Sequence, residues 1–254
     1  MEYQLGESIG TGSFSICYKA YKGTETVAVK VIDKSKKMGP YEELCISTEI
    51  KILSKISHPN IIKYIEYYEN NSNIYIVTNL YNEDLNKYLK HWSFNEVEAV
   101  NLFLPIVNAV KYLHANNYVH RDIKAANVFL EHVDGKIIPH LGDFGLATQI
   151  GTEYLSKQVG TAYWIAPEIL TSRYGKEVDI WSLGVLLHLM ISKKLAFKHG
   201  QDETKKEVFK NIAEVNYIKY PFSDLVNRVI SGILVKNPEQ RLTLTQIENL
   251  LKLI

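Results

Sequence analysis

The chain has 254 residues, of which 46% are hydrophobic and 22% charged, and 29 Lys and Arg against 28 Asp and Glu give a formal net charge of +1. This composition excludes a disordered chain, because disorder requires low hydrophobicity together with high net charge. The near-neutral charge gives no overall attraction to nucleic acid or to an anionic membrane, although it leaves room for a local basic patch. We expect a folded chain of one large domain or two packed lobes.

The cysteine content and the apolar runs favour an intracellular protein, in the cytoplasm or the nucleus. Cys17 and Cys45 are too few for a disulfide framework or a cysteine-ligated metal site. The first four residues have neither the basic start nor the apolar stretch of a signal peptide. The most apolar run, residues 180–191, is shorter than the roughly 20 residues that span a bilayer, so it predicts a buried helix.

The first third of the chain is predicted to be rich in strands. Residues 3–32 alternate short apolar segments with glycine-rich breaks. A helix is predicted to begin at Pro40 and to end at residues 57–60, because Pro59 disfavours helix at the residue before it. The strand candidates are residues 26–32, 61–68 and 74–78.

After Asn79 the pattern changes to helical spacing. A helix is predicted up to His114, with a kink or a rearranged turn near Pro105, which removes one backbone hydrogen bond. Further helices are predicted over residues 178–191, 223–235 and 245–254. No repeat or linker separates the two regions, so we expect two lobes of one unit.

A glycine-rich segment, Gly-Thr-Gly-Ser-Phe-Ser at residues 10–15, lies between two strand candidates. Its glycines allow the backbone to fold closely over phosphate oxygens, but any turn between strands also uses glycine. A dinucleotide-binding loop would need a helix directly afterwards, and a Walker loop would need Gly-Lys-Ser/Thr; neither follows. The segment alone does not decide between a phosphate loop and a plain turn.

Residues 120–127, His-Arg-Asp-Ile-Lys-Ala-Ala-Asn, are more informative, because they place a carboxylate, an ammonium group and an amide in one short loop. Asp-Phe-Gly at 143–145, Ala-Pro-Glu at 166–168 and Val-Ala-Val-Lys at 27–30 accompany it. In these motifs the chain resembles the eukaryotic protein kinase family over residues 3–254. The resemblance implies a two-lobed α+β fold. A small antiparallel-sheet N-lobe with one long helix (1–78), a hinge (79–82) and a larger, mainly helical C-lobe (83–254) would form one catalytic domain.

The resemblance also implies residues that bind ATP and Mg²⁺. Phosphoryl transfer spreads charge over the moving group, so catalysis is mostly positioning and electrostatic stabilisation. Lys30 would bind the α and β phosphates and pair with Glu49. Asp143 would bind magnesium, and Asn127 would hold a second ion.

Four further residues are implied in catalysis at the acceptor side. Asp122 would accept the proton of the substrate hydroxyl, and Lys124 would neutralise charge on the γ-phosphate. Arg121 precedes Asp122, and Thr161 lies in residues 160–168, which resemble the family's peptide-docking segment. Lys124 and this segment favour a serine/threonine kinase that acts on proteins, and Leu146 is more compatible with serine than with threonine as the acceptor.

The predicted nucleotide site draws on the glycine-rich segment, the strands and the hinge. Thr78 is a small gatekeeper residue, Cys17 is expected to be an inert apolar group rather than a reactive thiol, and Ser15 replaces the third glycine, which restricts positive φ. The nucleotide-binding candidates are Ile9, Gly10, Gly12, Ser13, Phe14, Cys17, Ala28, Lys30, Thr78, Asn79, Tyr81, Asp84, Phe129 and Asp143.

Regulation and sequence preference stay open. Arg121 suggests pairing with a phosphate between residues 143 and 168, because guanidinium binds dianions well. Lys157 stands where many relatives are phosphorylated; the candidates are Ser156, then Thr152 and Tyr154. The alternative is a segment ordered without phosphate.

Arginine-selecting kinases often have acidic residues where this chain has Ala126 and Leu189. Strong selection for basic substrates is therefore not expected, although Asp84 could attract one basic side chain.

Three residues are expected to act structurally. Glu168 and Arg241 resemble a buried pair that ties the docking segment to the C-terminal helices, and Asp179 resembles the carboxylate that fixes the catalytic loop.

Together, these features predict an ATP- and magnesium-dependent serine/threonine protein kinase, which is a transferase. We expect a monomer with protein substrates, no nucleic-acid or membrane partner, and a regulatory partner, if any, of unknown identity. A kinase-like scaffold and a small-molecule phosphotransferase are the alternatives.

Overall fold

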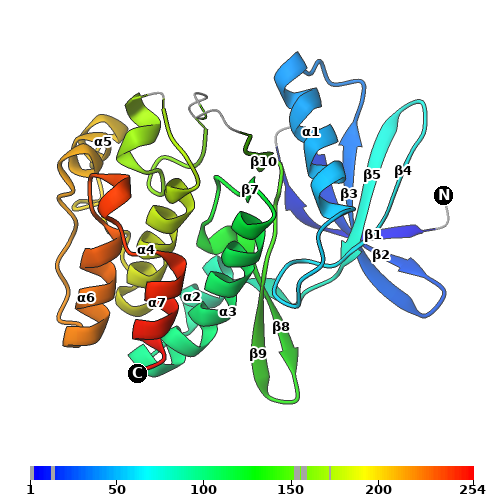
Figure 1. The fold of residues 1–254 in the computed structure, drawn as a ribbon. Coiled ribbons are helices and arrows are strands. Elements are labelled where there is room, and N and C mark those ends of the chain that lie inside the picture. Colours follow the sequence, from blue (N-terminus) through cyan, green and yellow to red (C-terminus); the bar gives the residue numbers. More distant parts are fainter. Residues whose placement is uncertain (1–2, 13–14, 152–154, 156–158, 172) are drawn as a thin grey trace.

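The protein has two lobes of different composition (Figure 1). This computed structural model describes residues 3–12, 15–151, 155, 159–171 and 173–254. The smaller lobe is a five-stranded antiparallel sheet with the long helix α1 (Pro40–Leu53), and the larger lobe is mainly helical. The predicted fold class is confirmed.

The N-lobe sheet has the order β1-β2-β3-β5-β4. The central strand β3 contains the β-branched run expected for a buried strand, and Val27 and Val29 are buried. A two-residue turn joins β2 to β3, and Gly23 has the positive φ of 61° that such a turn requires. The strands are β1 (Gln4–Thr11), β2 (Ser15–Lys22), β3 (Glu25–Asp33), β4 (Tyr64–Glu69) and β5 (Asn73–Asn79).

Helix α1 begins as predicted, with Pro40 in its first turn, where a missing N–H costs nothing. It ends at Leu53, four residues before the expected end. The N–H groups of Lys55 and Ile56 both donate to the carbonyl of Ile52, which tightens the last turn. The helix therefore ends before it reaches Pro59.

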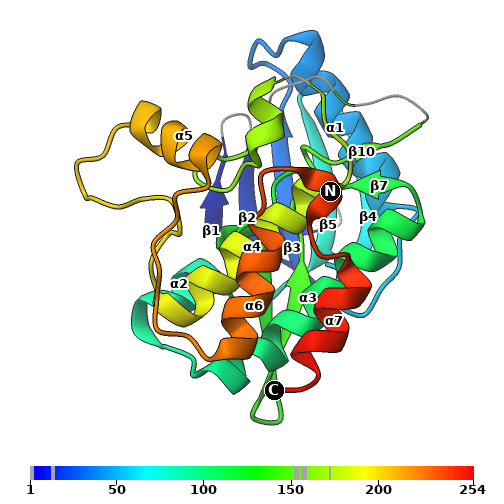
Figure 2. The same ribbon diagram turned by 60° about the vertical axis from the view of Figure 1, so that its left-hand side comes forward.

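The C-lobe core is built around α4 (Glu177–Ser192), which packs against α3 (Glu96–Ala115) and α6 (Asp224–Ile233) (Figure 2). Nearly every residue of α4 is buried, as the apolar run 180–191 predicts. The remaining helices are α2 (Leu85–His91), α5 (Lys205–Glu214) and α7 (Leu244–Leu251). Among the helices that the structure describes, none is both long enough and apolar enough to cross a membrane.

Two predictions about α3 have different outcomes. Its N-terminus carries a capping box, in which Asn95 and Glu98 each accept the other's backbone N–H. The helix continues through Pro105 to Ala115, one residue past its predicted end at His114, whereas the kink or rearranged turn expected near Pro105 stays a prediction. Buried apolar side chains on both sides of Pro105 hold this helix in the core.

The C-lobe also contains strands that the helical interpretation of the sequence missed. The hairpin of β8 (Val128–Val133) and β9 (Lys136–Leu141) turns at Asp134 and Gly135, which have φ of 49° and 74°. An Asp-Gly pair between apolar runs is a strong hairpin signal. The shorter elements are β6 (Glu83–Asp84), β7 (Tyr118–Val119), β10 (Thr148–Gln149), η1 (Ala125–Asn127), η2 (Pro167–Thr171) and η3 (Pro238–Gln240). The catalytic-loop candidates lie just before this hairpin, and Asp143 lies just after it.

Candidate active site

The loop that follows β7 is anchored by a buried carboxylate from α4. Asp179 Oδ2 accepts the backbone N–H of His120 at 2.9 Å and His114 Nε2 at 2.8 Å, and Asp179 Oδ1 accepts the N–H of Arg121 at 2.8 Å. Burial opposes ionisation of Asp179, but the hydrogen bond and charge of His114 and the donors of the loop outweigh it and lower the pKa of this carboxyl. The predicted role of Asp179 is confirmed, whereas the part of His114 was not predicted. Its position on the buried face of α3 was the available signal.

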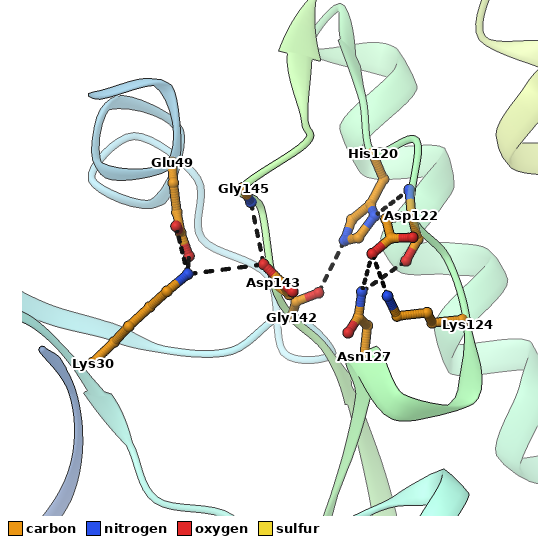
Figure 3. Close-up of polar contacts among 9 residues, drawn as sticks. All are labelled: Lys30, Glu49, His120, Asp122, Lys124, Asn127, Gly142, Asp143 and Gly145. Atoms are coloured by element: carbon orange, nitrogen blue, oxygen red, sulfur yellow. Dashed lines mark hydrogen bonds and ion pairs between the residues drawn. The ribbon is translucent and has the colours of Figure 1, made fainter. Parts of the chain in front are cut away.

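Asp122, the predicted proton acceptor, is held by three side chains. Lys124 Nζ lies 2.6 Å from Oδ2, and Asn127 Nδ2 donates to Oδ2 at 3.0 Å (Figure 3). Thr161 Oγ1 donates to Oδ1 at 2.8 Å. Lys124 Nζ also donates to Thr161 Oγ1 at 2.9 Å. Asp122 is only 6% exposed, so these contacts fix the direction of its carboxylate. The structure thus brings four predicted residues into one cluster.

Asp143 lies beside that cluster, two residues after the β8–β9 hairpin ends at Leu141. The N–H of Gly142 donates to the carbonyl of Asn127 at 2.8 Å, and His120 Nε2 donates to the carbonyl of Gly142 at 3.0 Å. A Cβ on Gly142 would lie 2.7 Å from the ring of Phe129, so only glycine fits there. Asp143 itself has φ of 59°, the left-handed region, which directs its carboxylate toward the N-lobe.

The N-lobe contributes an ion pair to the same space. Lys30 Nζ lies 2.9 and 2.8 Å from the two carboxylate oxygens of Glu49 on α1, and 3.9 Å from Asp143 Oδ1 (Figure 3). Burial by itself would lower the pKa of Lys30, but the carboxylates of Glu49 and Asp143 outweigh it and raise that pKa. Although burial opposes it, the charge of Lys30 also holds the pKa of Asp143 below its usual value. Both groups are therefore charged at neutral pH.

The oxygen donors here suit a magnesium ion. The side chain of Asp143 is 45% exposed, and the amide nitrogen of Asn127 is engaged by Asp122, which turns the amide oxygen away from that carboxylate. In the described part of the chain, no group of three His, Cys, Asp or Glu side chains could hold a metal alone. Mg²⁺ commonly binds through one or two carboxylates plus substrate phosphates. The residues present therefore fit an ion that binds together with ATP.

The glycine-rich segment closes the hairpin between β1 and β2. The N–H of Gly12 donates to the carbonyl of Ser15 at 2.8 Å, and the predicted residues Ser13 and Phe14 fall in a gap of the described chain. None of Gly10, Gly12 and Ser15 has a positive φ, so the side chain of Ser15 is accommodated without strain. The restriction on positive φ that a serine imposes is therefore not felt at Ser15.

The adenine-pocket candidates share one face of the N-lobe sheet. Cys17 is paired with Lys30 across the strands, and Ala28 with Thr78, so their side chains point the same way as that of Lys30. The register of β1 against β2 shifts by one residue at Ile9, a bulge that changes the direction of the strand there. Burial raises the pKa of the Cys17 thiol, which favours the inert apolar role.

The hinge candidates connect β5 to β6. The N–H of Asn79 donates to the carbonyl of Lys63 at 3.0 Å, and the hydroxyl of Tyr81 accepts the N–H of Lys63 at 3.0 Å. The ring of Tyr81 packs on His140 and on Phe129 of β8. Asp84 is the N-cap of α2: it accepts the N–H of Lys87 at 2.9 Å and lies 3.3 Å from Lys87 Nζ.

Arg121 has protein partners in the structure. Its Nε donates to the carbonyl of Leu146 at 2.7 Å, and its Nη1 donates to the hydroxyl of Tyr174 at 3.3 Å. Tyr174 in turn forms two backbone hydrogen bonds with Leu155. No sequence motif indicated this role for Tyr174. The phosphorylation candidates Thr152, Tyr154 and Ser156 lie outside the described residues.

The docking segment is tied to the C-terminal part of the lobe as predicted. Glu168 and Arg241 form a two-point ion pair at 2.6 and 2.7 Å, and both are buried. The guanidinium of Arg241 also lies over the ring of Trp181, 5.0 Å from its centre. The segment that begins at Thr161 beside Asp122 is therefore fixed at its far end too.

Comparisons with known proteins identify the family to which this chain belongs. A family model described as protein kinase domain matches residues 3–250. Myosin light chain kinase A of Dictyostelium discoideum is 35% identical over 97% of this chain and 86% of that protein. A probable serine/threonine-protein kinase PLK of the same organism is 35% identical over 97% of this chain and 26% of that protein.

Human ribosomal protein S6 kinase alpha-2 is 36% identical over 96% of this chain and 34% of that protein. The chain thus spans most of the first relative and only about a quarter to a third of the other two. With a family model that covers nearly its whole length and relatives named as kinases, one of them as a probable serine/threonine-protein kinase, this chain belongs to the protein kinase family, as an ATP-dependent enzyme of the serine/threonine type.

Proposed function

We propose that this chain transfers the γ-phosphoryl group of ATP to serine or threonine hydroxyls of protein substrates, with Asp122 as the group that orients the hydroxyl and accepts its proton. The single observation that carries this proposal is the cluster in which Lys124, Thr161 and Asn127 hold the Asp122 carboxylate. A carboxylate held from three sides needs little reorganisation when the hydroxyl arrives.

Lys124 and Lys30 supply positive charge on two sides of the transferring group. Lys124 Nζ is 2.6 Å from Asp122, close enough to reach an oxygen of the γ-phosphate that faces the acceptor. Lys30, kept protonated by Glu49 and Asp143, would bind the α and β phosphates. Asp143 and Asn127 would hold magnesium, which supplies charge neutralisation of the phosphates when bound.

The nucleotide would lie under the glycine-rich turn, between β1–β3 and β8. Ile9, Cys17, Ala28 and Phe129 would enclose the adenine, and the backbone from Asn79 to Tyr81 would read its edge. Thr78 would remain the gatekeeper. A nucleotide role for Asp84 is the weakest of these assignments, because its carboxylate already caps α2.

Several broader features belong to the same proposal. The N-lobe would end at residue 78, the hinge would span 79–82 and the C-lobe would follow. An intracellular monomer without nucleic-acid or membrane partners agrees with the net charge of +1. The carboxylates and lysines of the site disfavour a scaffold without activity. The fixed docking segment disfavours a phosphotransferase for small molecules.

The test is phosphate transfer from radiolabelled ATP with magnesium to a generic acceptor protein. Asp122→Ala and Asp143→Ala should each reduce transfer by at least about 100-fold. Glu239→Gln, an exposed carboxylate in η3, serves as the matched control and should keep full activity. Wild-type transfer no higher than that of Asp122→Ala, in protein that binds ATP, would support the scaffold instead.

A further inference from the structure

A group of lysines follows α4 and extends into α5. This lysine cluster consists of Lys193, Lys194, Lys198, Lys205, Lys206 and Lys210. All are exposed except Lys198, which is half-buried. Across the described residues, no carboxylate forms an ion pair with any of the six.

Three acids lie within residues 193–210, and two of them, Glu203 and Glu207, are engaged in local contacts. Glu203 accepts the N–H of His199 at 2.6 Å and Asn211 Nδ2 at 2.6 Å. Glu207 accepts the N–H of Thr204 at 2.7 Å as part of the capping box of α5. These contacts direct both carboxylates to the backbone and to a side-chain amide. Asp202 is the third acid of residues 193–210, so the six lysines still leave an excess of positive charge for another partner.

The cluster adjoins the docking segment. Lys198 Nζ lies over the ring of Tyr163, 5.8 Å from its centre, and Tyr163 is two residues beyond Thr161, which bonds to Asp122. Helix α5 contacts η2, which contains the end of that segment, and the two lie near each other in both views (Figures 1 and 2). Lys198 and the lysines of α5 therefore lie beside the surface that leads away from the catalytic carboxylate.

The backbone at Lys198 is well fixed. The ring of the preceding residue, Phe197, stacks on Trp181 of α4 at 5.2 Å, and the carbonyl of Ala196 accepts the N–H of Ile218. Both Phe197 and Trp181 are completely buried. A charge on such a rigid base loses less entropy when it binds a partner than one on a free loop.

The places where acids would attract a basic substrate are neutral or occupied. Ala126, beside the catalytic loop, is exposed, and Leu189 on α4 is half-buried. Asp84 is engaged by α2 and Lys87. The surface around the docking segment thus offers unpaired positive charge at the lysine cluster.

We propose that the lysine cluster, with Lys198 at its centre, selects protein substrates that carry acidic side chains near the acceptor serine or threonine. This inference rests on the proposed function of the site. At about 3.3 Å per extended residue, a peptide that crosses the docking segment reaches Lys198 within about six residues of the hydroxyl. Opposite charges there steer the substrate and fix its register.

An acidic protein segment fits the cluster better than nucleic acid does. The chain as a whole carries a net charge of only +1, whereas general nucleic-acid binding relies on a strongly basic surface. Lys198 also contacts the docking segment, where a protein substrate would bind, rather than a surface remote from the active site. An oligonucleotide that binds as tightly as an acidic peptide of equal charge is therefore an outcome that would overturn the proposal.

The test measures binding and turnover of three peptides that share one acceptor serine and differ only in acidic, neutral or basic flanks of six residues. We expect the acidic peptide to have the lowest KM and the tightest binding by fluorescence anisotropy. Lys198→Ala should raise its KM about two- to fivefold, and Lys198→Glu about tenfold, with kcat nearly unchanged. Addition of salt should reduce the difference between the peptides.

Lys136→Glu is the matched control, because Lys136 is an exposed lysine of the β8–β9 hairpin without an ion pair in the described structure. The proposal is overturned if wild-type protein shows no preference for the acidic peptide in binding. It is also overturned if Lys198→Glu keeps the preference, or if Lys136→Glu removes it equally. Transfer to a generic acceptor protein separates the two claims: if that transfer persists while the preference is absent, the proposed function stands and the specificity fails.

Discussion

Asp179 on α4 accepts the backbone N–H of Arg121 at 2.8 Å, and Arg121 has φ of 66°. A left-handed conformation costs a non-glycine residue about 1–2 kcal/mol. The buried carboxylate offsets that cost by fixing two consecutive N–H groups of the loop, those of His120 and Arg121. The direction of Asp122, the next residue, therefore depends on a side chain that never touches substrate.

Asp179→Asn should reduce both stability and turnover. An amide has only one acceptor oxygen, so one loop N–H or His114 would lose its partner inside the core, at a cost of about 2–4 kcal/mol. We expect kcat to fall by at least about tenfold because Asp122 would no longer be held in place. Urea unfolding and steady-state kinetics measure the two effects. Asp224→Asn, in the first turn of α6, should change neither, and equal effects of both substitutions would contradict this role.

Asp179 should also make stability depend on acid pH. Its pKa is lowered in the folded chain from the ordinary value of 3.8, mainly by His114 and the loop donors acting against burial. The stabilisation is therefore complete above about pH 4 and is lost as the pH falls through the lowered pKa. Unfolding free energies of the wild type and Asp179→Asn should converge below that pH. A constant difference across the acid range would contradict the assignment.

Glu49→Gln should weaken the function of Lys30 without unfolding the protein. The neutral amide no longer balances the ammonium group, so Lys30 would be free to turn toward Asp143. We expect the KM for ATP to rise or kcat to fall by about tenfold or more. Glu43→Gln, on the exposed side of the same helix, is the control and should behave as the wild type.

The Glu168–Arg241 pair should contribute to folding rather than to chemistry. Removal of one partner leaves a buried charge, so Glu168→Gln should destabilise the chain by about 3–5 kcal/mol. The variant with both residues replaced by leucine or methionine should lose less than the sum of the single substitutions, because no charge is left unpaired. Additive losses in thermal unfolding would show that the two residues act separately.

The hydroxyl of Tyr174 should replace a phosphate as the partner of Arg121, so that the segment before residue 160 is ordered without phosphorylation. The guanidinium of Arg121 already donates to the hydroxyl of Tyr174 and to the carbonyl of Leu146. We expect phosphatase-treated protein to keep most of its activity, and Tyr174→Phe to lower it severalfold. Loss of activity on phosphatase treatment, with phosphate found between residues 145 and 168 by mass spectrometry, would instead support the phosphorylation switch.

The sequence predicted which residues come together at the candidate site better than it predicted the elements that carry them. Asp122, Lys124, Asn127 and Asp143 are identifiable because phosphoryl transfer requires these groups at short, fixed spacings. The hairpin of β8 and β9 was missed although its Asp134-Gly135 turn was visible, because helical spacing dominates the sequence on either side. Local periodicity does not show that a short pair of strands will position the catalytic loop and Asp143.

Contacts between distant segments were the least predictable. Tyr174 binds Arg121 across 53 positions of the chain, and His114 binds Asp179 across 65. Neither residue belongs to a short motif, and a tyrosine or histidine on a buried face is more often simply part of a core. Helix α5 was missed for a different reason: its sequence is rich in lysines such as Lys205 and Lys206, and its buried face consists only of Val208 and Ile212, which is a short apolar pattern.

The most direct measurement of the central claim is single-turnover phosphoryl transfer at saturating ATP and magnesium, with wild type and Asp122→Asn compared at equal nucleotide occupancy. We expect the substitution to slow transfer by about 100- to 10,000-fold while the dissociation constant for ATP stays within about twofold. Equal single-turnover rates in the two proteins would contradict it.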